Sequence, residues 1–129
     1  MHFKFTVATA ALAVCLPIKA FAQDAAKGEV TFKKCQICHE VGPSAKAKVG
    51  PILNEVMGRP AGTLPGFAYS PAMKEAGEKG MTWTDENLAK YLENPRDFIP
   101  KNKMAFVGLK NETERADVIA YVKKFTPPK

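Results

Sequence analysis

The chain has 129 residues, of which 46% are hydrophobic and 25% are charged, a balance typical of one small globular domain. Its formal net charge is +6, and no motif that combines basic and aromatic residues accompanies the lysines. This moderately basic balance favours an acidic protein partner or a charged membrane surface and argues against a nucleic-acid partner.

Residues 1–22 have the pattern of a cleaved secretory signal. A basic start, Met1 to Lys4, precedes an uncharged run of 14 residues over positions 5–18. Small residues at Ala20 and Ala22 then provide a cleavage site. A membrane-spanning helix needs roughly 20 apolar residues, so a retained anchor is the weaker interpretation.

A lipoprotein that begins at Cys15 is weaker still, because bulky Val14 precedes this cysteine in place of a small residue. We therefore expect cleavage after Ala22, which leaves residues 23–129 as one exported domain in the periplasm. The removed segment holds two lysines and no acidic residue, so the mature chain carries a net charge of +4.

The first predicted helix of the mature chain runs over about residues 25–36. Asp24 can cap its start, and Val30 and Phe32 are among its apolar positions. A loop-rich segment follows this helix.

The middle of the chain is expected to hold little regular structure. A short helix is predicted near residues 52–57, with Leu53, Val56 and Met57 on one face. A turn-rich span rich in proline and glycine then continues as far as Pro71.

Two clear helices are predicted in the second half. One runs from a cap at Thr84 to a stop before Pro95, and the last covers about residues 111–125, where Asn111 and Glu114 resemble a capping box. No Val/Ile-rich run indicates a strand, so we predict an all-α domain of about four or five short helices and long loops. The inner faces of the two helices hold Leu88, Tyr91 and Leu92 in the first, and Val118, Ile119, Tyr121, Val122 and Phe125 in the last.

The segment CQICH holds the only cysteines of the mature chain, Cys35 and Cys38, and its only histidine, His39. A zinc site would need four ligands and is improbable here. A redox dithiol is chemically feasible in an export compartment, but its fold needs alternating strands and helices. A bare disulfide would close a tiny loop and add little stability. Covalent haem attachment uses all three residues, two thiols on the vinyl groups and the histidine on the iron.

A haem iron bound by one histidine needs a second axial ligand or keeps an open position. Met104 lies between Pro100 and Gly108, where a regular helix cannot continue, so a loop can present its thioether to the iron. We therefore predict Met104 as this ligand. The other methionines of the mature chain are Met57, read as core, Met73, in a Lys/Glu-rich surface stretch, and Met81, beside Trp83.

The whole mature chain resembles the class I cytochromes c, in particular the bacterial cytochrome c₂ type, close to mitochondrial cytochrome c. The resemblance is carried by CQICH, VGPILNEVMGRPAG, PGFAYS, MTWT, YLENPRDFIPKNKMAFVG and NETERADVIAYVKKF. It implies a small cytochrome c fold wrapped around one covalent haem c. It also implies thioether bonds at Cys35 and Cys38, with His39 and Met104 as axial ligands. The Pro51 carbonyl is then expected to accept a hydrogen bond from the other nitrogen of His39.

The resemblance also implies an environment for the haem. Tyr69 and Trp83 are expected to bond a buried propionate with Arg59 nearby, and Tyr91 is expected close to the Met104 sulfur. Without the resemblance, the three aromatic residues would be read as buried structural residues of a small helical domain.

Gly28 and Tyr121 are expected where the first and last helices cross. The sequence departs from the mitochondrial pattern at Asn102, where a threonine usually bonds the second propionate, and at Met73, where an asparagine usually orders a buried water. The stretch KEAGEKG, residues 74–80, is also about three residues longer than its mitochondrial counterpart. These departures leave the predicted ligands intact.

Several lysines flank the haem-binding motif and the Met104 loop. They could simply be solvated surface charges, but a basic ring at this place would steer docking to acidic partners and weaken with salt. We predict that they form a docking ring: Lys33, Lys34, Lys46, Lys48, Lys101 and Lys103.

The pattern predicts a soluble, monomeric, periplasmic one-electron carrier and not an enzyme, because no constellation of catalytic acid, base or nucleophile is present. Methionine and histidine ligation predicts a high redox potential. By resemblance, electrons would come from a cytochrome bc₁ complex and pass to a photosynthetic reaction centre or a terminal oxidase. The alternative is a haem enzyme or gas sensor with an open sixth position on the iron, and the absence of a distal histidine weighs against it.

Overall fold

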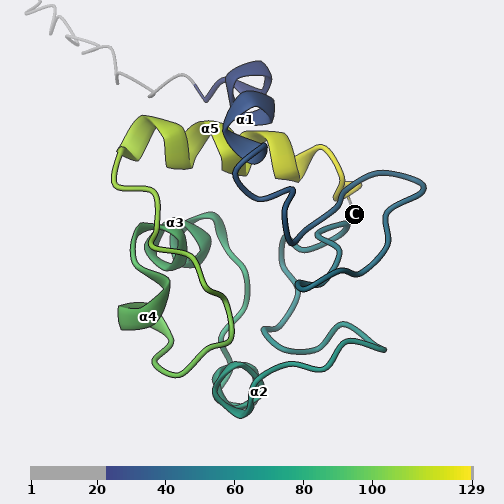
Figure 1. Cartoon of the computed structure of the whole chain (residues 1–129), viewed down its shortest axis with the longest axis vertical. Helices are drawn as coiled ribbons and strands as arrows, with labels where there is room; N and C mark the ends of the chain where they lie inside the picture. Colours follow the sequence, from purple (N-terminus) through teal and green to yellow (C-terminus); the bar gives the residue numbers. More distant parts are fainter. Residues whose placement is uncertain (1–22, 129) are drawn as a thin grey trace, which may run out of the picture.

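A computed structural model describes residues 23–128, so the predicted signal over residues 1–22 lies outside the described part of the chain. The described residues form five helices joined by long loops (Figure 1), with no strand beyond an isolated antiparallel bridge between Pro60 and Thr82. The all-α prediction of four or five short helices is therefore confirmed. The helices are α1 (Ala25–Phe32), α2 (Pro71–Glu78), α3 (Asp85–Glu93), α4 (Pro95–Phe98) and α5 (Glu112–Lys123).

The helices start where short polar side chains can accept hydrogen bonds from free backbone N–H groups. Asp24 accepts from two N–H groups of the first turn of α1, at 3.0 and 3.1 Å. Thr84 caps α3 at 3.1 Å and Asn111 caps α5 at 3.0 Å, as predicted. Ser70 caps α2 in the same way, at 3.1 Å.

Two predictions in the first half of the chain are wrong. Helix α1 ends at Phe32, four residues earlier than expected, and turns continue the chain toward His39. The helix predicted near residues 52–57 is absent, because Glu55 adopts the left-handed region with a φ of 58°. The N–H of Glu55 donates to the carbonyl of Phe125 at 2.9 Å, a contact with the other end of the chain.

The predicted stop before Pro95 is confirmed, since α3 ends at Glu93, but α2 and α4 are helices that the sequence analysis did not predict. Ser70 followed by Pro71 is a start signal, a capping side chain and a proline at the first helical position. Pro95 ends α3 and occupies the first position of α4. Both helices are short, and Met73, assigned to a surface stretch, is half-buried within α2.

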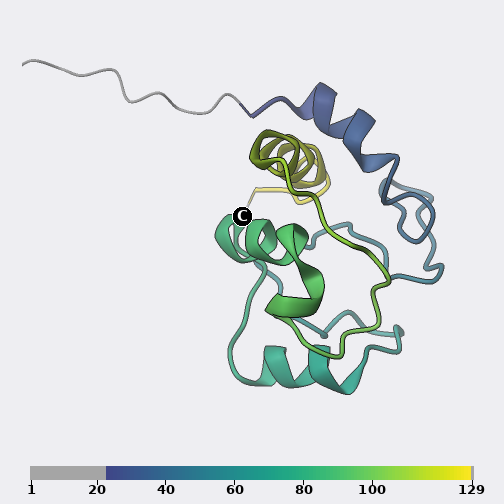
Figure 2. The same ribbon diagram turned by 60° about the vertical axis from the view of Figure 1, so that its left-hand side comes forward.

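The crossing of α1 and α5 is the main helix contact (Figures 1 and 2), and α5 also packs on α3, which packs on α4. Gly28 makes this close approach feasible, since a Cβ atom there would lie 1.9 Å from the carbonyl oxygen of Asp117 and 2.9 Å from Cβ of Tyr121. The expected crossing at Gly28 and Tyr121 is present. Phe32 packs against Tyr121 with ring centroids 5.2 Å apart.

The loop over residues 33–70 runs along one side of the molecule, to the right in Figures 1 and 2, while α3 and α4 lie on the other side. Helix α2 packs on this loop, because Gly77 lets the helix approach the Ala61 carbonyl. None of the helices within residues 23–128 is long and apolar enough to cross a lipid bilayer. The predicted site residues lie on this loop, on or next to α3, and on the segment that follows α4.

Substitution of Gly28 by alanine should lower the free energy of unfolding by at least about 2 kcal/mol, because the added methyl group overlaps the Asp117 backbone and must push the helices apart. Denaturant unfolding of the mature protein measures this change. The exposed neighbour Glu29 is the control, and Glu29→Ala should change the stability by less than about 0.5 kcal/mol. Equal effects of the two substitutions would contradict the proposed close contact.

Candidate functional site

The predicted cysteine and histidine residues lie on one turn that follows α1. The backbone N–H groups of Cys38 and His39 both donate to the Cys35 carbonyl, at 3.0 and 2.8 Å. Both thiols are free and partly buried. Burial, together with electrostatic repulsion from Cys38, raises the pKa of Cys35 to about 11, and Lys34 opposes this shift. Such a thiol is protonated near neutral pH, unlike the low-pKa cysteine of a redox dithiol.

The His39 ring is held by a backbone carbonyl. Its Nδ1 atom lies 2.7 Å from the carbonyl oxygen of Pro51, which can only accept, so Nδ1 carries the proton and donates. The lone pair is therefore on Nε2, the tautomer that a metal-binding histidine requires. Burial lowers the pKa of His39, and the hydrogen bond to Pro51 partly offsets this. The ring is a neutral imidazole with one nitrogen available as a ligand.

The loop that carries Pro51 is fixed by side chains that the sequence analysis did not single out. Asn54 bonds Gly42 twice, accepting from its N–H at 3.0 Å and donating to its carbonyl at 2.8 Å. Glu40 accepts from the N–H of Lys46 at 2.7 Å and pairs with the Lys48 ammonium group at 3.2 Å. These bonds hold a segment without helix in one conformation.

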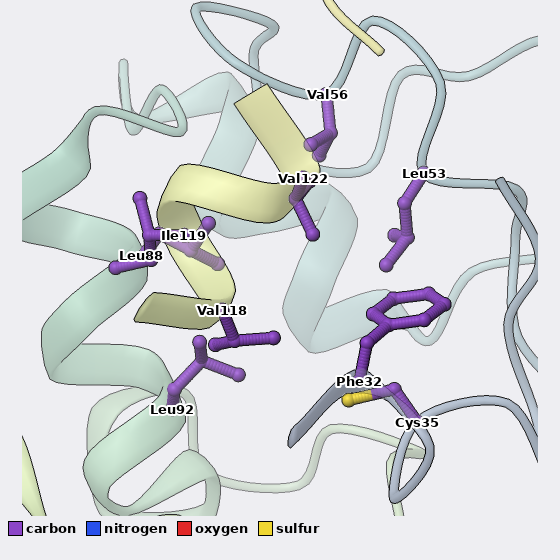
Figure 3. A pocket seen from close by; sticks show the side chains of 9 residues that line it. All are labelled: Phe32, Cys35, Leu53, Val56, Leu88, Leu92, Val118, Ile119 and Val122. Atoms are coloured by element: carbon purple, nitrogen blue, oxygen red, sulfur yellow. The ribbon is translucent and has the colours of Figure 1, made fainter. Parts of the chain in front are cut away.

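An apolar pocket lies next to the turn that carries Cys35 (Figure 3). Its wall is formed by Cys35 together with apolar side chains that converge from α1, α3, α5 and the loop, so no polar partner is offered to a ligand there. The Cys35 side chain therefore borders apolar side chains. The lining residues are Phe32, Cys35, Leu53, Val56, Leu88, Leu92, Val118, Ile119 and Val122.

Met104 lies on the irregular segment between α4 and α5 and is partly buried. The Tyr91 hydroxyl donates to its sulfur across 3.8 Å. Burial raises the pKa of Tyr91, so the hydroxyl keeps its proton and remains a donor. The Tyr91 ring packs against Trp83, with centroids 5.0 Å apart, and against Phe98. An aromatic cluster on α3 and its flanks thus orients one end of the Met104 side chain.

The other residues expected around the haem fall into two groups. Trp83 is buried and joined to Arg59 through the backbone, since its N–H donates to the Arg59 carbonyl at 3.0 Å. The Arg59 guanidinium donates to the Asn54 carbonyl at 3.2 Å, so it is tied to the same loop as Pro51. Tyr69 forms the second group: it is half-buried, and its ring packs against Phe67 with centroids 4.8 Å apart.

The six lysines of the expected docking ring are all exposed. Three of them are tied within the chain: Lys34 pairs with a glutamate of α5 at 3.4 Å, Lys48 pairs with Glu40, and Lys103 donates to the Ala68 carbonyl at 3.3 Å. The remaining three have no salt bridge within the described residues and are the most available to a partner: Lys33, Lys46 and Lys101.

Asn102 also has a role that the sequence analysis did not anticipate, since it appeared there only as a departure from a pattern. Its side chain accepts from the N–H of Met104 at 2.7 Å. An asparagine two residues before the bonded N–H is the signature of an Asx turn, a local signal that could have been found.

The donor set fits a covalently bound haem. It provides two thiols and a neutral imidazole nitrogen on one turn, a thioether that the tyrosine hydroxyl orients, and an apolar wall beside Cys35. The residues present therefore match the group that the CxxCH segment predicts.

Comparisons with known proteins agree with this chemistry. A family model described as cytochrome c matches residues 25–126. The cytochrome c2 of Rhodomicrobium vannielii is 56% identical over 101 residues, 78% of each chain, and that of Blastochloris viridis is 52% identical over 106 residues, covering 82% of this chain and 81% of the relative. The structure of cytochrome c2 from Rhodospirillum centenum superposes with a TM-score of 0.77 at 48% identity, over 81% of this chain and 99% of that one.

Substitution of Gly50 by alanine should disturb the His39 ring, because the added Cβ would lie 2.4 Å from its Cε1 atom. We expect the ring to leave its hydrogen bond with Pro51 and the free energy of unfolding of the mature, haem-bearing protein to fall by about 1–3 kcal/mol. Denaturant unfolding and the yield of covalently loaded chain measure the effect. Val49→Ala is the control, since Val49 is exposed and should change neither quantity. An unchanged Gly50→Ala protein would contradict the tight fit of the ring.

Proposed function

Because the chain belongs to the cytochrome c family, we propose that it is a high-potential one-electron carrier of the periplasm. Like its relatives, it is an electron-transfer cytochrome with one covalently bound haem c. The strongest support for the finer assignment is the hydrogen bond between His39 and Pro51, which leaves Nε2 of the only histidine in residues 23–128 as a ligand atom.

In this proposal Cys35 and Cys38 would hold the haem through thioether bonds, and His39 and Met104 would bind its iron. When bound, haem c supplies an iron that accepts and releases one electron between its ferric and ferrous states. The Pro51 carbonyl keeps the imidazole in the ligating tautomer and raises its basicity. The Tyr91 hydroxyl bonds the Met104 sulfur and fixes the side-chain position.

The residues around the site support a high potential. A thioether is a soft ligand that favours the ferrous state, and the apolar wall formed by α3 and α5 disfavours the additional positive charge of the ferric state. The buried Tyr91 stays protonated, so it adds no negative charge that would favour the ferric state. Trp83, Arg59 and Tyr69 are proposed to surround the haem propionates.

The chain is proposed to act as a monomer between membrane redox complexes. Electrons would come from a cytochrome bc₁ complex and go to a photosynthetic reaction centre or a terminal oxidase. The exposed lysines support docking on acidic surfaces, since exposed charges steer encounters with partners of opposite charge. The proposed signal over residues 1–22, cleaved after Ala22, would deliver the chain to the periplasm.

An absorption spectrum of the exported protein tests the core of the proposal. A c-type haem with the weak long-wavelength ferric band of sulfur ligation, and a ferrous spectrum that carbon monoxide leaves unchanged, supports the electron carrier. A spectrum without this band, or one that shifts with carbon monoxide, means an accessible iron and supports a haem enzyme or gas sensor.

Substitution of Met104 by alanine should remove the long-wavelength ferric band and make the ferrous protein bind carbon monoxide, because the proposed sixth ligand is lost. Met81→Ala is the matched control, since it removes another partly buried methionine near Trp83 and should keep the band. The spectra of both variants at neutral pH decide the assignment. A Met104→Ala protein that retains the band would show that another atom is the ligand.

Charge reversal of the unpaired lysines should slow electron transfer with a membrane partner. For Lys33→Glu and Lys46→Glu, we expect the second-order rate of reduction by a cytochrome bc₁ complex at low salt to fall several-fold and its dependence on salt to weaken. Stopped-flow measurements at several ionic strengths provide the rates.

Lys90→Glu makes the same change of net charge, but Lys90 lies on α3, outside the haem-binding motif, the loop after it and the Met104 loop. This control should retain most of the wild-type rate. If all three variants slow equally, net charge alone matters and the docking ring is not supported.

A further inference from the structure

The side chain of Asn102 joins three backbone groups from α4 and the segment that follows it. Its Nδ2 donates to the carbonyls of Pro95 and Ile99, both at 2.8 Å. Its Oδ1 accepts from the N–H of Met104 at 2.7 Å. One amide therefore links the first residue of α4, the residue directly after α4 and the backbone of the proposed iron ligand.

The two carbonyls belong to a firm part of the molecule. Pro95 is fully buried and Ile99 is 4% exposed, so both are anchored in the core. Each carbonyl also accepts from a backbone N–H, that of Ile99 on Pro95 at 3.1 Å and that of Asn102 on Ile99 at 3.2 Å, so the side-chain amide of Asn102 adds a second hydrogen bond to each. The bonds thus connect the Met104 segment to core residues.

The segment that needs this support has few bonds of its own. The residues between α4 and α5 form no helix. Among them, Lys101 adopts a φ of 65°, in the left-handed region, which costs free energy for a residue with a side chain. Near Met104 the backbone contributes a bond from the N–H of Phe106 to the Met104 carbonyl at 2.9 Å. A strained turn persists only where its surroundings hold it.

We propose that Asn102 is the positioning residue that keeps the Met104 thioether in place for ligation, by binding the Met104 segment to both ends of α4. This inference rests on the proposed function, in which Met104 is the axial ligand. It also assigns Asn102 a task different from the one its position implies by resemblance. Both amide hydrogens already have backbone acceptors, so Asn102 supports the loop and does not donate to a haem propionate.

Two substitutions separate hydrogen bonding from packing. Asn102→Ala removes all three bonds. Asn102→Asp keeps the size and the acceptor for the Met104 N–H, but it places an oxygen against the carbonyls of Pro95 and Ile99 in place of the donor. Asn87→Ala is the matched control, because Asn87 is also partly buried and also donates to a backbone carbonyl, that of Thr82 at 2.8 Å.

Each haem-bearing protein is unfolded in denaturant while two signals are recorded. The long-wavelength ferric band reports the bond from the Met104 sulfur, and far-ultraviolet circular dichroism reports the helices. The rate at which carbon monoxide binds to the ferrous protein in the absence of denaturant reports how often this bond opens.

With both Asn102 variants we expect the band to disappear at a lower denaturant concentration than the helical signal, and carbon monoxide to bind at least about tenfold faster than in the wild type. In Asn87→Ala the two signals should shift together, and the binding rate should stay within about twofold of the wild type. A purely structural role of Asn102 would also move both signals together.

Two outcomes separate the inference from the proposed function. If the wild type lacks the band, the assignment of Met104 fails, and the positioning role of Asn102 fails with it. If the wild type shows the band but the Asn102 variants behave like Asn87→Ala, Met104 stands and Asn102 does not position it. Equal behaviour of Asn102→Asp and the wild type would likewise overturn the inference, because it would show that the two donated bonds are not needed.

Discussion

The close approach of α1 to α5 is the contact on which the rest of the molecule depends. At Gly28 the two helices are so near that the Asp117 carbonyl occupies the space of a side chain. This approach brings Phe32 onto Tyr121, and the turn with the two thiols begins directly after Phe32. The inner face of α5 also lines the apolar pocket beside Cys35, so one crossing determines both where the thiols lie and what covers them (Figure 3).

Most of the candidate site lies on loops, and polar side chains give these loops their shape. An irregular backbone leaves N–H and carbonyl groups without partners, and a primary amide can satisfy both kinds at once. Asn54 does so for Gly42 on the side of His39, and Asn102 does so for the segment of Met104. These two side-chain amides therefore satisfy backbone groups that a hydrogen-bond ladder would satisfy in a sheet. The described residues of this domain form no strand.

The distribution of charge separates the interior of the site from its surface. Inside, burial favours the neutral forms: it lowers the pKa of His39 and raises that of Tyr91. Outside, the lysines near the site are exposed, and the side chains of three of them make neither a salt bridge nor a hydrogen bond within the described residues. Because the interior is neutral, the change in charge of the redox centre is the main electrostatic change inside the site. The exposed charges instead act on the encounter with a partner. This arrangement is coherent for a carrier that meets partners briefly.

The amino-acid sequence by itself determined the features that rest on local chemistry: the capped starts of α1, α3 and α5, the cysteines and histidine of CQICH, and the all-α class. It also identified the family, although the roles assigned to His39 and Met104 stay predictions. Only the tertiary structure decided that residues 52–57 form no helix, since the N–H of Glu55 bonds a carbonyl near the other end of the chain. It likewise decided that Asn102 binds both ends of α4. The Glu55 bond joins groups that are remote in the sequence, so their distance depends on how the whole chain packs. The Asn102 bonds span fewer residues, but they form only because the chain turns back on α4 after Ile99.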